Sequence, residues 1–177
     1  MYSDFEEISL RLYGKRFDGA KWRKGVVSIA EIVDKVALKL LANTVLSEDY
    51  RLHTTKQEIK ENEAELDVKY SWQFENEWQH LQVKTNNIPS PYDENTETAF
   101  FLDRPYGYGK IDEKESNETE VSHSSWHTNK VHEYSIDVDF SRQFDPVFNI
   151  LNNMVLHSVI LAEGSTVKIH KSHRIPS

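Results

Sequence analysis

Hydrophobic and polar residues alternate over long stretches of the chain. In residues 64–74, AELDVKYSWQF, the side chains at even positions are apolar or aromatic and those at odd positions are polar. A period of two is typical of a strand that buries one face. The polar residues 75–77 and the run WQHLQVKT that follows them predict that this strand turns back as a hairpin. Residues 132–140, HEYSIDVDF, alternate in the same way and predict another strand.

Shorter runs predict further strands, separated by polar turns. They lie at residues 7–16, 25–32, 50–60, 106–114, 118–126, 158–164 and 165–171. Many strands with few helices predict a closed or strongly curved antiparallel β-barrel. No segment has the composition of a linker between domains, so we expect residues 1–177 to form a single domain.

Helical spacing of apolar residues is clear in one segment only. From Val33 to Val45 the apolar positions recur every three or four residues, and Asp34 suits the first turn of a helix. Shorter helices are expected at residues 94–102 and 144–153, and Pro146 in the second fits a first-turn position. The sequence therefore predicts a mainly β fold of the α+β type, with one clear helix and one or two short ones.

The chain carries a net charge of -8, which disfavours negatively charged partners. Nucleic acids and anionic membranes bind positively charged surfaces, so we expect neither as a partner. The chain has no cysteine, which excludes disulfides and thiolate metal sites. Its first residues, MYSDFEEISLRLY, lack the basic and apolar regions of a signal peptide, and we expect a cytoplasmic location.

Glycine and histidine pairs raise the question of phosphate or metal binding. Gly107 and Gly109 do not form a phosphate loop, because the residues after them continue a strand instead of starting a helix. His123 and His127 share strand parity, but at ~3.3 Å per residue their side chains lie more than about 10 Å apart, too far to ligate one zinc ion. We therefore expect no metal and no cofactor. Tyr106 and Tyr108 share the other face of this strand, and one of them could line a cavity.

Four residues offer acid-base or covalent chemistry. Lys35 lies one helical turn after Glu31, and a lysine whose pKa is lowered by burial or a neighbouring cation can form a Schiff base with a carbonyl substrate. His123 could act as an acid or base near neutral pH. Glu163 follows an apolar run, where it is either a turn residue or an inward-facing carboxylate. From the residues alone, a solvated lysine and a hydrogen-bonded structural histidine are the favoured interpretations.

Four segments, taken in order, are similar to one known family. They are EEISLRLYGKR…WRKGVVSIAEIV, ETAFFLDRPYGYGK, ETEVSHSSWHTNKVHEYSIDVDF and HSVILAEGSTVKIHKSHRI. Together they cover nearly the whole chain and resemble the uncharacterised YqjF-like family, which is related to acetoacetate decarboxylase. The resemblance implies an acetoacetate-decarboxylase-like β-barrel with a central cavity. Family members usually start further upstream, so we expect this chain to lack N-terminal strands, and a homodimer could cover the edge left exposed.

The resemblance also implies which side chains face the cavity. The positions that match the family are Tyr108, His123, Trp126 and Glu163. Arg104 departs from the histidine that is usual there. The decarboxylase activates its Schiff-base lysine with an adjacent lysine, but this chain has no Lys-Lys pair. Lys35 falls near the matching place with a valine as its neighbour, which puts the decarboxylase mechanism in doubt.

Three functions remain open. The first is binding of a small molecule of unknown identity in the barrel cavity, with Glu31 and Arg104 at the edge of the site. The second is an enzyme acting on a small keto acid, with Lys35 as the nucleophile and Glu31 as the acid or base. The third is a structural or oligomeric module without a ligand.

Overall fold

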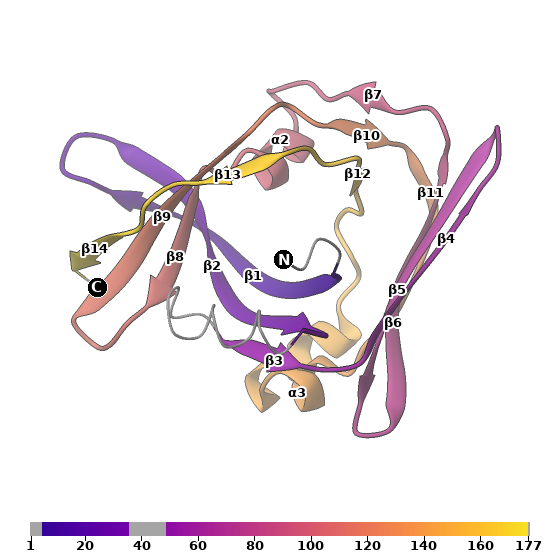
Figure 1. Ribbon diagram of the computed structural model, residues 1–177, viewed down its shortest axis with the longest axis horizontal. Helices are drawn as coiled ribbons and strands as arrows, with labels where there is room; N and C mark the ends of the chain where they lie inside the picture. The colour runs from indigo at the N-terminus through magenta and orange to yellow at the C-terminus, as the bar shows by residue number, and fades with distance from the viewer. Residues whose placement is uncertain (1–4, 36–48, 177) are drawn as a thin grey trace. The chain divides into compact units, whose positions relative to one another are not determined.

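A computed structural model describes residues 5–35 and 49–176 (Figure 1). The chain forms two compact units. Of the described residues, unit 1 contains those up to Leu52, Tyr92–Ser125 and those from Ser165 onward, and unit 2 contains His53–Pro91 and Trp126–Gly164. Each unit is therefore assembled from segments that are distant in the sequence, and the single-domain assignment stays a prediction.

Unit 1 is built on a seven-stranded sheet with the order β1-β2-β8-β9-β13. Two more strands complete it, since β3 pairs with β2 and β14 pairs with β9. The strands are β1 (Glu7–Phe17), β2 (Trp22–Val33), β3 (Tyr50–Leu52), β8 (Tyr106–Lys110), β9 (Glu115–His123), β13 (Val167–Ile169) and β14 (His173–Pro176). Both β3 and β8 run parallel to β2, whereas β1 and β2 form a long curved hairpin (Figure 1).

Unit 2 contains two smaller antiparallel sheets, ordered β11-β6-β5-β4 and β12-β10-β7. Their strands are β4 (Thr55–Glu61), β5 (Glu65–Phe74), β6 (Glu77–Asn86), β7 (Ser90–Pro91), β10 (His127–Asn129), β11 (Val131–Asp137) and β12 (Leu161–Ala162). Glu75 and Asn76 both have positive φ between β5 and β6. Two residues in this conformation make the tight turn that matches the twist of a hairpin, as the alternating pattern predicted.

Short helices accompany the sheets. The helix α2 (Glu97–Leu102) in unit 1 confirms the prediction for residues 94–102. In unit 2, the segment predicted as helical at 144–153 forms the 3₁₀ helix η1 (Pro146–Asn153), capped by the Asp145 carboxylate, which accepts the Val147 N–H. The short helix α3 (Phe140–Gln143) precedes η1 and was not predicted.

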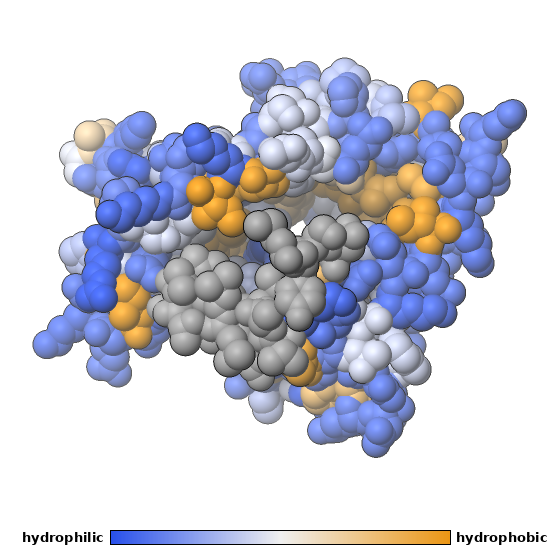
Figure 2. All heavy atoms as spheres, viewed as in Figure 1, coloured by the Kyte–Doolittle hydropathy of each residue, from blue (hydrophilic) through white to orange (hydrophobic). Residues whose placement is uncertain are grey.

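Each unit has a small set of buried apolar side chains. In unit 1, Ala30, Ile32 and Val33 at the end of β2 are fully buried. In unit 2, Val68 and Trp72 on β5 are buried, and the Trp72 indole N–H donates to Gln143 Oε1 at 3.1 Å. On the face shown in Figure 2, hydrophilic residues cover most of the surface and hydrophobic residues lie in separate patches. None of the helices in the described part of the chain is long and apolar enough to span a membrane.

The structure confirms a mainly β chain but corrects two finer predictions. Among the described residues, no strand pairing joins the two ends of any sheet, so the sheets are open and do not form a closed barrel. The sheet of unit 1 is also mixed, because β3 and β8 run parallel to β2. The predicted helix does not include Val33, because Val33 is the last residue of β2. Residues 36–45 of that prediction lie outside the described residues.

Candidate functional site

Strand parity brings several polar side chains to one face of the unit 1 sheet. Glu7, Ser9, Arg11 and Tyr13 alternate along β1, so their side chains share a face. Ser9 lies opposite Glu31 of β2, and Glu31 lies opposite Tyr50 of β3. We call the group of Glu7, Ser9, Arg11, Glu31 and Tyr50 the Glu31 cluster.

Glu31 is the centre of this cluster and is held by several donors. Its side chain is only 1% accessible. Arg11 donates from Nε at 3.4 Å and from Nη2 at 3.3 Å to Glu31 Oε1, and the Ser9 hydroxyl donates to Oε2. A buried carboxylate is tolerated only when it is paired and hydrogen-bonded. Arg11 and Ser9 therefore fix Glu31 as a positioned, ion-paired group.

Glu7 shares the same guanidinium. Arg11 Nη2 donates to Glu7 Oε1 at 3.2 Å, and the Tyr50 hydroxyl donates to Glu7 Oε2 at 3.1 Å. Burial and, second, the nearby Glu31 carboxylate raise the pKa of Glu7, and together they outweigh the opposite effects of Arg11, Tyr50 and Ser9. One arginine thus serves two carboxylates.

An aromatic group lies further along the same face of β1. Tyr13 follows Arg11 by two residues, about 6.6 Å along the strand at ~3.3 Å per residue. Its ring contacts Phe101 of α2 edge-on, with centroids 5.2 Å apart, and lies 5.9 Å from the ring of Phe100. The guanidinium of Arg104 stacks over Phe100 at 3.9 Å and lies 5.8 Å from the Tyr13 ring. We call Arg104, Phe100 and Tyr13 the Arg104 site.

Arg104 carries buried donors that lack an acceptor. Within residues 5–35 and 49–176, neither its Nε nor its Nη2 has a hydrogen-bond partner, although both atoms are buried. Burial lowers the pKa of Arg104, because removing the charged guanidinium from water makes its ionised form less stable. The carboxylate of the preceding residue, Asp103, does not bond these two nitrogens, and its Oδ1 accepts from the Tyr92 hydroxyl at 2.6 Å. A small anion would satisfy this guanidinium.

Tyr108 belongs to a different group of residues. Tyr108 on β8 pairs with Val27 of β2, which in turn pairs with Leu12 of β1. Because side chains alternate along β1, this places Tyr108 on the face of the sheet opposite to Arg11 and Tyr13. Tyr108 lines an open hollow of about 370 Å³ together with Val27, Gly109, Lys110, Asp112, Glu113 and Ser116. Tyr108 and the Glu31 cluster therefore do not line one cavity on this sheet.

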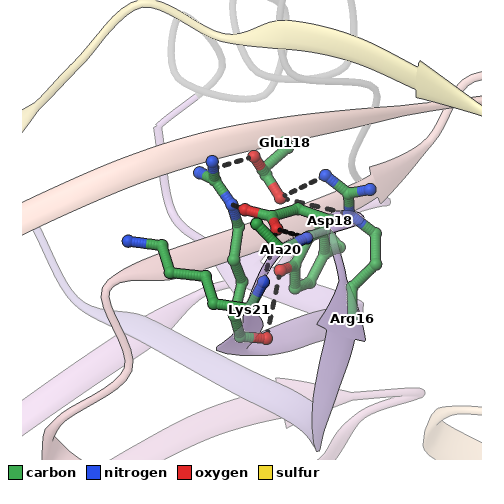
Figure 3. Close-up of polar contacts among 7 residues, drawn as sticks. Arg16, Asp18, Ala20, Lys21 and Glu118 are labelled. Atoms are coloured by element: carbon green, nitrogen blue, oxygen red, sulfur yellow. Dashed lines mark hydrogen bonds and ion pairs between the residues drawn. The ribbon is translucent and has the colours of Figure 1, made fainter.

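Tyr108 lies beside Glu118, which forms ion pairs with two arginines. The buried Glu118 carboxylate accepts from Arg16 Nη2 at 3.0 Å and from Arg23 Nη1 at 3.2 Å. Figure 3 shows Glu118 facing Arg16, with Asp18 beside them. Burial and then the Glu118 charge raise the pKa of Tyr108. The strand predicted at residues 118–126 begins earlier, at Glu115, and Glu118 within β9 has a structural role.

The other predicted site residues are distributed over both units. His123 ends β9 on the same face as Tyr13 by the strand registers, and its Nδ1 lies 2.8 Å from the Ser124 carbonyl oxygen. Trp126 and Glu163 belong to unit 2. Glu163 is half exposed, and its carboxylate lies 3.6 Å from Nδ1 of His127. Their placement in one cavity with His123 stays a prediction.

Lys35 has surroundings that differ from those of a Schiff-base lysine. Glu31 lies on strand β2, so the helical turn expected between Glu31 and Lys35 is absent. The Lys35 ammonium contacts the Asp34 carboxylate at 2.9 Å, and its side chain is partly accessible. A Schiff-base lysine is instead activated by burial or by a neighbouring cation.

Sequence reasoning identified Glu31 and Arg104 but missed their partners. The missed residues are Glu7, Ser9, Arg11, Tyr13, Tyr50, Phe100 and Glu118. The alternation in EISLRLY contained a signal for four of them, because it places Glu7, Ser9, Arg11 and Tyr13 on one face. The pairing of Ser9 with Glu31 depends on strand register, which the sequence does not display.

A family model described as an uncharacterised conserved protein, DUF2071, matches residues 1–165. No curated protein matches the chain. The match spans the hairpin of β1 and β2, the Arg104 site and all of unit 2, and its description assigns no activity.

Proposed function

Since the chain belongs to the DUF2071 family of uncharacterised conserved proteins, whose description assigns no activity, we propose from geometry that unit 1 binds a small anionic molecule at the Arg104 site. The buried and unpaired Nε and Nη2 of Arg104 carry this proposal. The acetoacetate-decarboxylase-like fold stays part of the same proposal, because the family resemblance implies a cavity that could hold the ligand.

The expected ligand is a small carboxylate with an apolar body. Two guanidinium N–H groups in a fixed plane match the two oxygens of a carboxylate. Phe100 is half exposed beside Arg104, and Tyr13 lies next to it. These rings offer contact to an apolar or aromatic group attached to the carboxylate.

Thermal stability in the presence of matched compounds tests the proposal. Benzoate supplies a carboxylate on an aromatic ring, and benzyl alcohol supplies a similar ring without the charge. At tenfold excess over its dissociation constant, benzoate should stabilise the folded protein by about 1.4 kcal/mol. Benzyl alcohol should have a much smaller effect, because it leaves the guanidinium without an anion.

Two arginine variants locate the effect. Arg104→Gln should abolish stabilisation by benzoate. Arg174→Gln is the control: Arg174 lies in the same unit, is 71% accessible and pairs with Glu115 at the surface. It should respond to benzoate like the wild type. Stabilisation that persists in Arg104→Gln, or that benzyl alcohol reproduces in full, would reject the Arg104 site.

The other two functions have less support from the described residues. A decarboxylase-like enzyme working through Lys35 would need an activating environment, whereas Lys35 contacts a carboxylate. A structural module without a ligand leaves the buried donors of Arg104 unexplained. Lack of stabilisation by benzoate and by aliphatic carboxylates such as hexanoate would favour that third function.

A further inference from the structure

Unit 2 places a serine, a histidine and an aspartate together on one face of its larger sheet. The strands β6 and β11 pair side by side (Figure 1), and their register sets His80 opposite Asp137 and Gln82 opposite Ser135. Residues two apart in a strand share a face, so Ser135 and Asp137 lie on the same face as His80. Strand pairing therefore joins groups that are 55 residues apart in the chain.

The imidazole of His80 lies between the other two groups. Its Nε2 is 3.2 Å from Ser135 Oγ, and its Nδ1 is 3.9 Å from Asp137 Oδ2. The first distance is that of a hydrogen bond and the second is that of an ion pair. The Asp137 carboxylate favours the tautomer with the proton on Nδ1, and Nε2 is then the acceptor for the Ser135 hydroxyl.

The accessibility of the three groups suits a reaction at the surface of the sheet. The His80 side chain is only 20% accessible, so its neighbours limit the positions that the ring can take. Ser135 is exposed, and a molecule from solvent can reach its hydroxyl. The Asp137 side chain is 74% accessible, and water screens its charge. We therefore expect His80 to contribute more to the reactivity of Ser135 than Asp137 does.

An exposed aromatic residue lies beside His80 on the same face. Trp78 precedes His80 by two residues on β6, which is about 6.6 Å along the strand at ~3.3 Å per residue. Trp78 is 49% exposed. An aromatic group that leaves from the side of His80 can pack against this ring. The surroundings of His80 therefore favour aryl esters over small alkyl esters.

We propose that Ser135 is a nucleophile that aryl esters of small acids acylate, with His80 as its general base and Asp137 as a positioning residue. Ser135 Oγ forms a bond to the ester carbonyl carbon while His80 Nε2 takes the hydroxyl proton. The bond from that carbon to the aryl oxygen then breaks, and the phenol leaves with the proton from His80. Water attacks the acyl group by the same route, which releases the acid and restores Ser135. This activity belongs to unit 2 and does not depend on the Arg104 site.

The ester p-nitrophenyl acetate tests the inference, because acylation leaves an acetyl group on the protein and releases a coloured phenol. Lysines also react with this ester, so peptide mass spectrometry of samples quenched early in acid locates the acetyl group. Ser135 should carry it. His80→Gln should lower the rate at Ser135 by at least about tenfold. Asp137→Asn should lower the rate by a smaller factor, and Asp137→Glu should retain more of it, because the carboxylate is kept.

Two controls separate this site from chance reactivity. His132 lies on β11 and contacts Glu65, and His132→Gln should leave the rate at Ser135 unchanged. Ser122 Oγ lies 2.9 Å from His170 Nε2, but among the described residues no carboxylate lies within ion-pair distance of that ring. Ser122 should therefore be acetylated more slowly than Ser135.

Three results would overturn the inference. The first is the absence of acetyl-Ser135 together with phenol release that Ser135→Ala leaves unchanged. The second is a rate at Ser135 that His80→Gln does not lower, and the third is acetylation of Ser122 as fast as that of Ser135. Chemical denaturation of Ser135→Ala and His80→Gln should show that both variants fold, so a lost reaction reports on the site itself.

Discussion

Gly25 lies where β8 passes closest to β2. A Cβ atom at this position would lie 2.5 Å from the Tyr108 ring, and it would also collide with the Tyr106 carbonyl. The backbone carbonyl cannot move without disturbing the parallel pairing of β2 and β8. Only glycine therefore fits at this position.

Replacing this glycine should weaken the sheet. We expect Gly25→Ala to lower the free energy of unfolding by about 1–3 kcal/mol, as overpacking does in a tight contact. Gly14→Ala is the matched control, because nothing lies within 4 Å of a Cβ atom at Gly14 on the partner strand. Chemical denaturation of both variants measures the difference. An equal effect of the two substitutions would contradict the account of Gly25.

Which glycine lies against a neighbouring strand could not be predicted from the sequence. Gly107 and Gly109 stand out in the sequence as a pair in a strand, where a glycine can mark close approach of a neighbour. At Gly107, however, a Cβ atom would have room, since its nearest neighbour would be 4.0 Å away. The close approach occurs at Gly25 because β8 joins β2 across about 80 residues of chain, and nothing local in the sequence records that pairing.

At the scale of elements, Glu118 ties the hairpin of β1 and β2 to β9. Its carboxylate is buried and accepts from one arginine on each strand of the hairpin, Arg16 and Arg23. Arg23 is in turn bonded to Asp18 in the turn of the hairpin at 2.7 Å. The end of the hairpin is thereby anchored by ion pairs, since few buried apolar residues lie there.

Removing the charge of Glu118 should loosen this anchor. Glu118→Gln leaves Arg16 without a carboxylate and Arg23 with Asp18 alone. We expect a loss of about 1–3 kcal/mol, less than for a fully buried pair, because both arginines are partly accessible. Glu120→Gln, two residues along the same strand, should change the free energy of unfolding by less than about 0.5 kcal/mol. Amide hydrogen exchange should show lower protection at the end of the hairpin in Glu118→Gln only. Unchanged protection would refute the anchoring role.

Elements with strong alternation were predicted well, and those that depend on distant partners were not. The hairpin of β5 and β6 follows from its period of two and its polar turn. The start of β9 was placed three residues too late, because the polar residues 115–117 between the two predicted strands suited a turn. An acidic strand residue is stable there only because arginines from the hairpin neutralise Glu118. The short helix α3 has too few residues for a periodic signal.

At the scale of the whole molecule, carboxylates with lowered pKa values make the free energy of unfolding fall as the pH becomes acidic. The strongest case is Asp18, whose pKa is lowered by the backbone N–H of Lys21, then by Arg23 and the N–H of Ala20. A carboxylate with a lower pKa in the folded state stabilises the protein above its ordinary value of 3.8, and this contribution is lost as the pH falls through the folded value. Glu7 has the opposite sign, because its raised pKa favours the folded state at low pH.

Unfolding measured between about pH 2 and pH 5 tests this balance. Asp18→Asn should be less stable than the wild type at pH 5, and the difference should shrink as the pH falls, because the wild type loses the contribution of its carboxylate. Glu113→Gln is the control, since Glu113 makes no hydrogen bond or ion pair within the described part of the chain. A difference between Asp18→Asn and the wild type that stays constant down to pH 2 would contradict the prediction.

The sequence predicted a mainly β chain, but it did not predict the arrangement of the sheets. Alternation identifies strands, whereas the order β1-β2-β8-β9-β13 joins segments from the beginning, middle and end of the chain. The same limit applies to the site. Arg104 and Tyr13 are separated by about 90 residues in sequence, and only the packing of α2 against β1 brings them together.

The NMR signal of the Arg104 side-chain Nε–H reports most directly whether Arg104 binds an anion. In nitrogen-15-labelled protein, Arg104→Gln identifies the signal and Arg174→Gln serves as the control. Titration with benzoate should move the Arg104 Nε–H signal in a saturable way, as an N–H···O bond to the carboxylate forms, while benzyl alcohol should leave it in place. If benzoate does not shift the Arg104 signal, or shifts exposed Arg174 equally, the guanidinium is not an anion site.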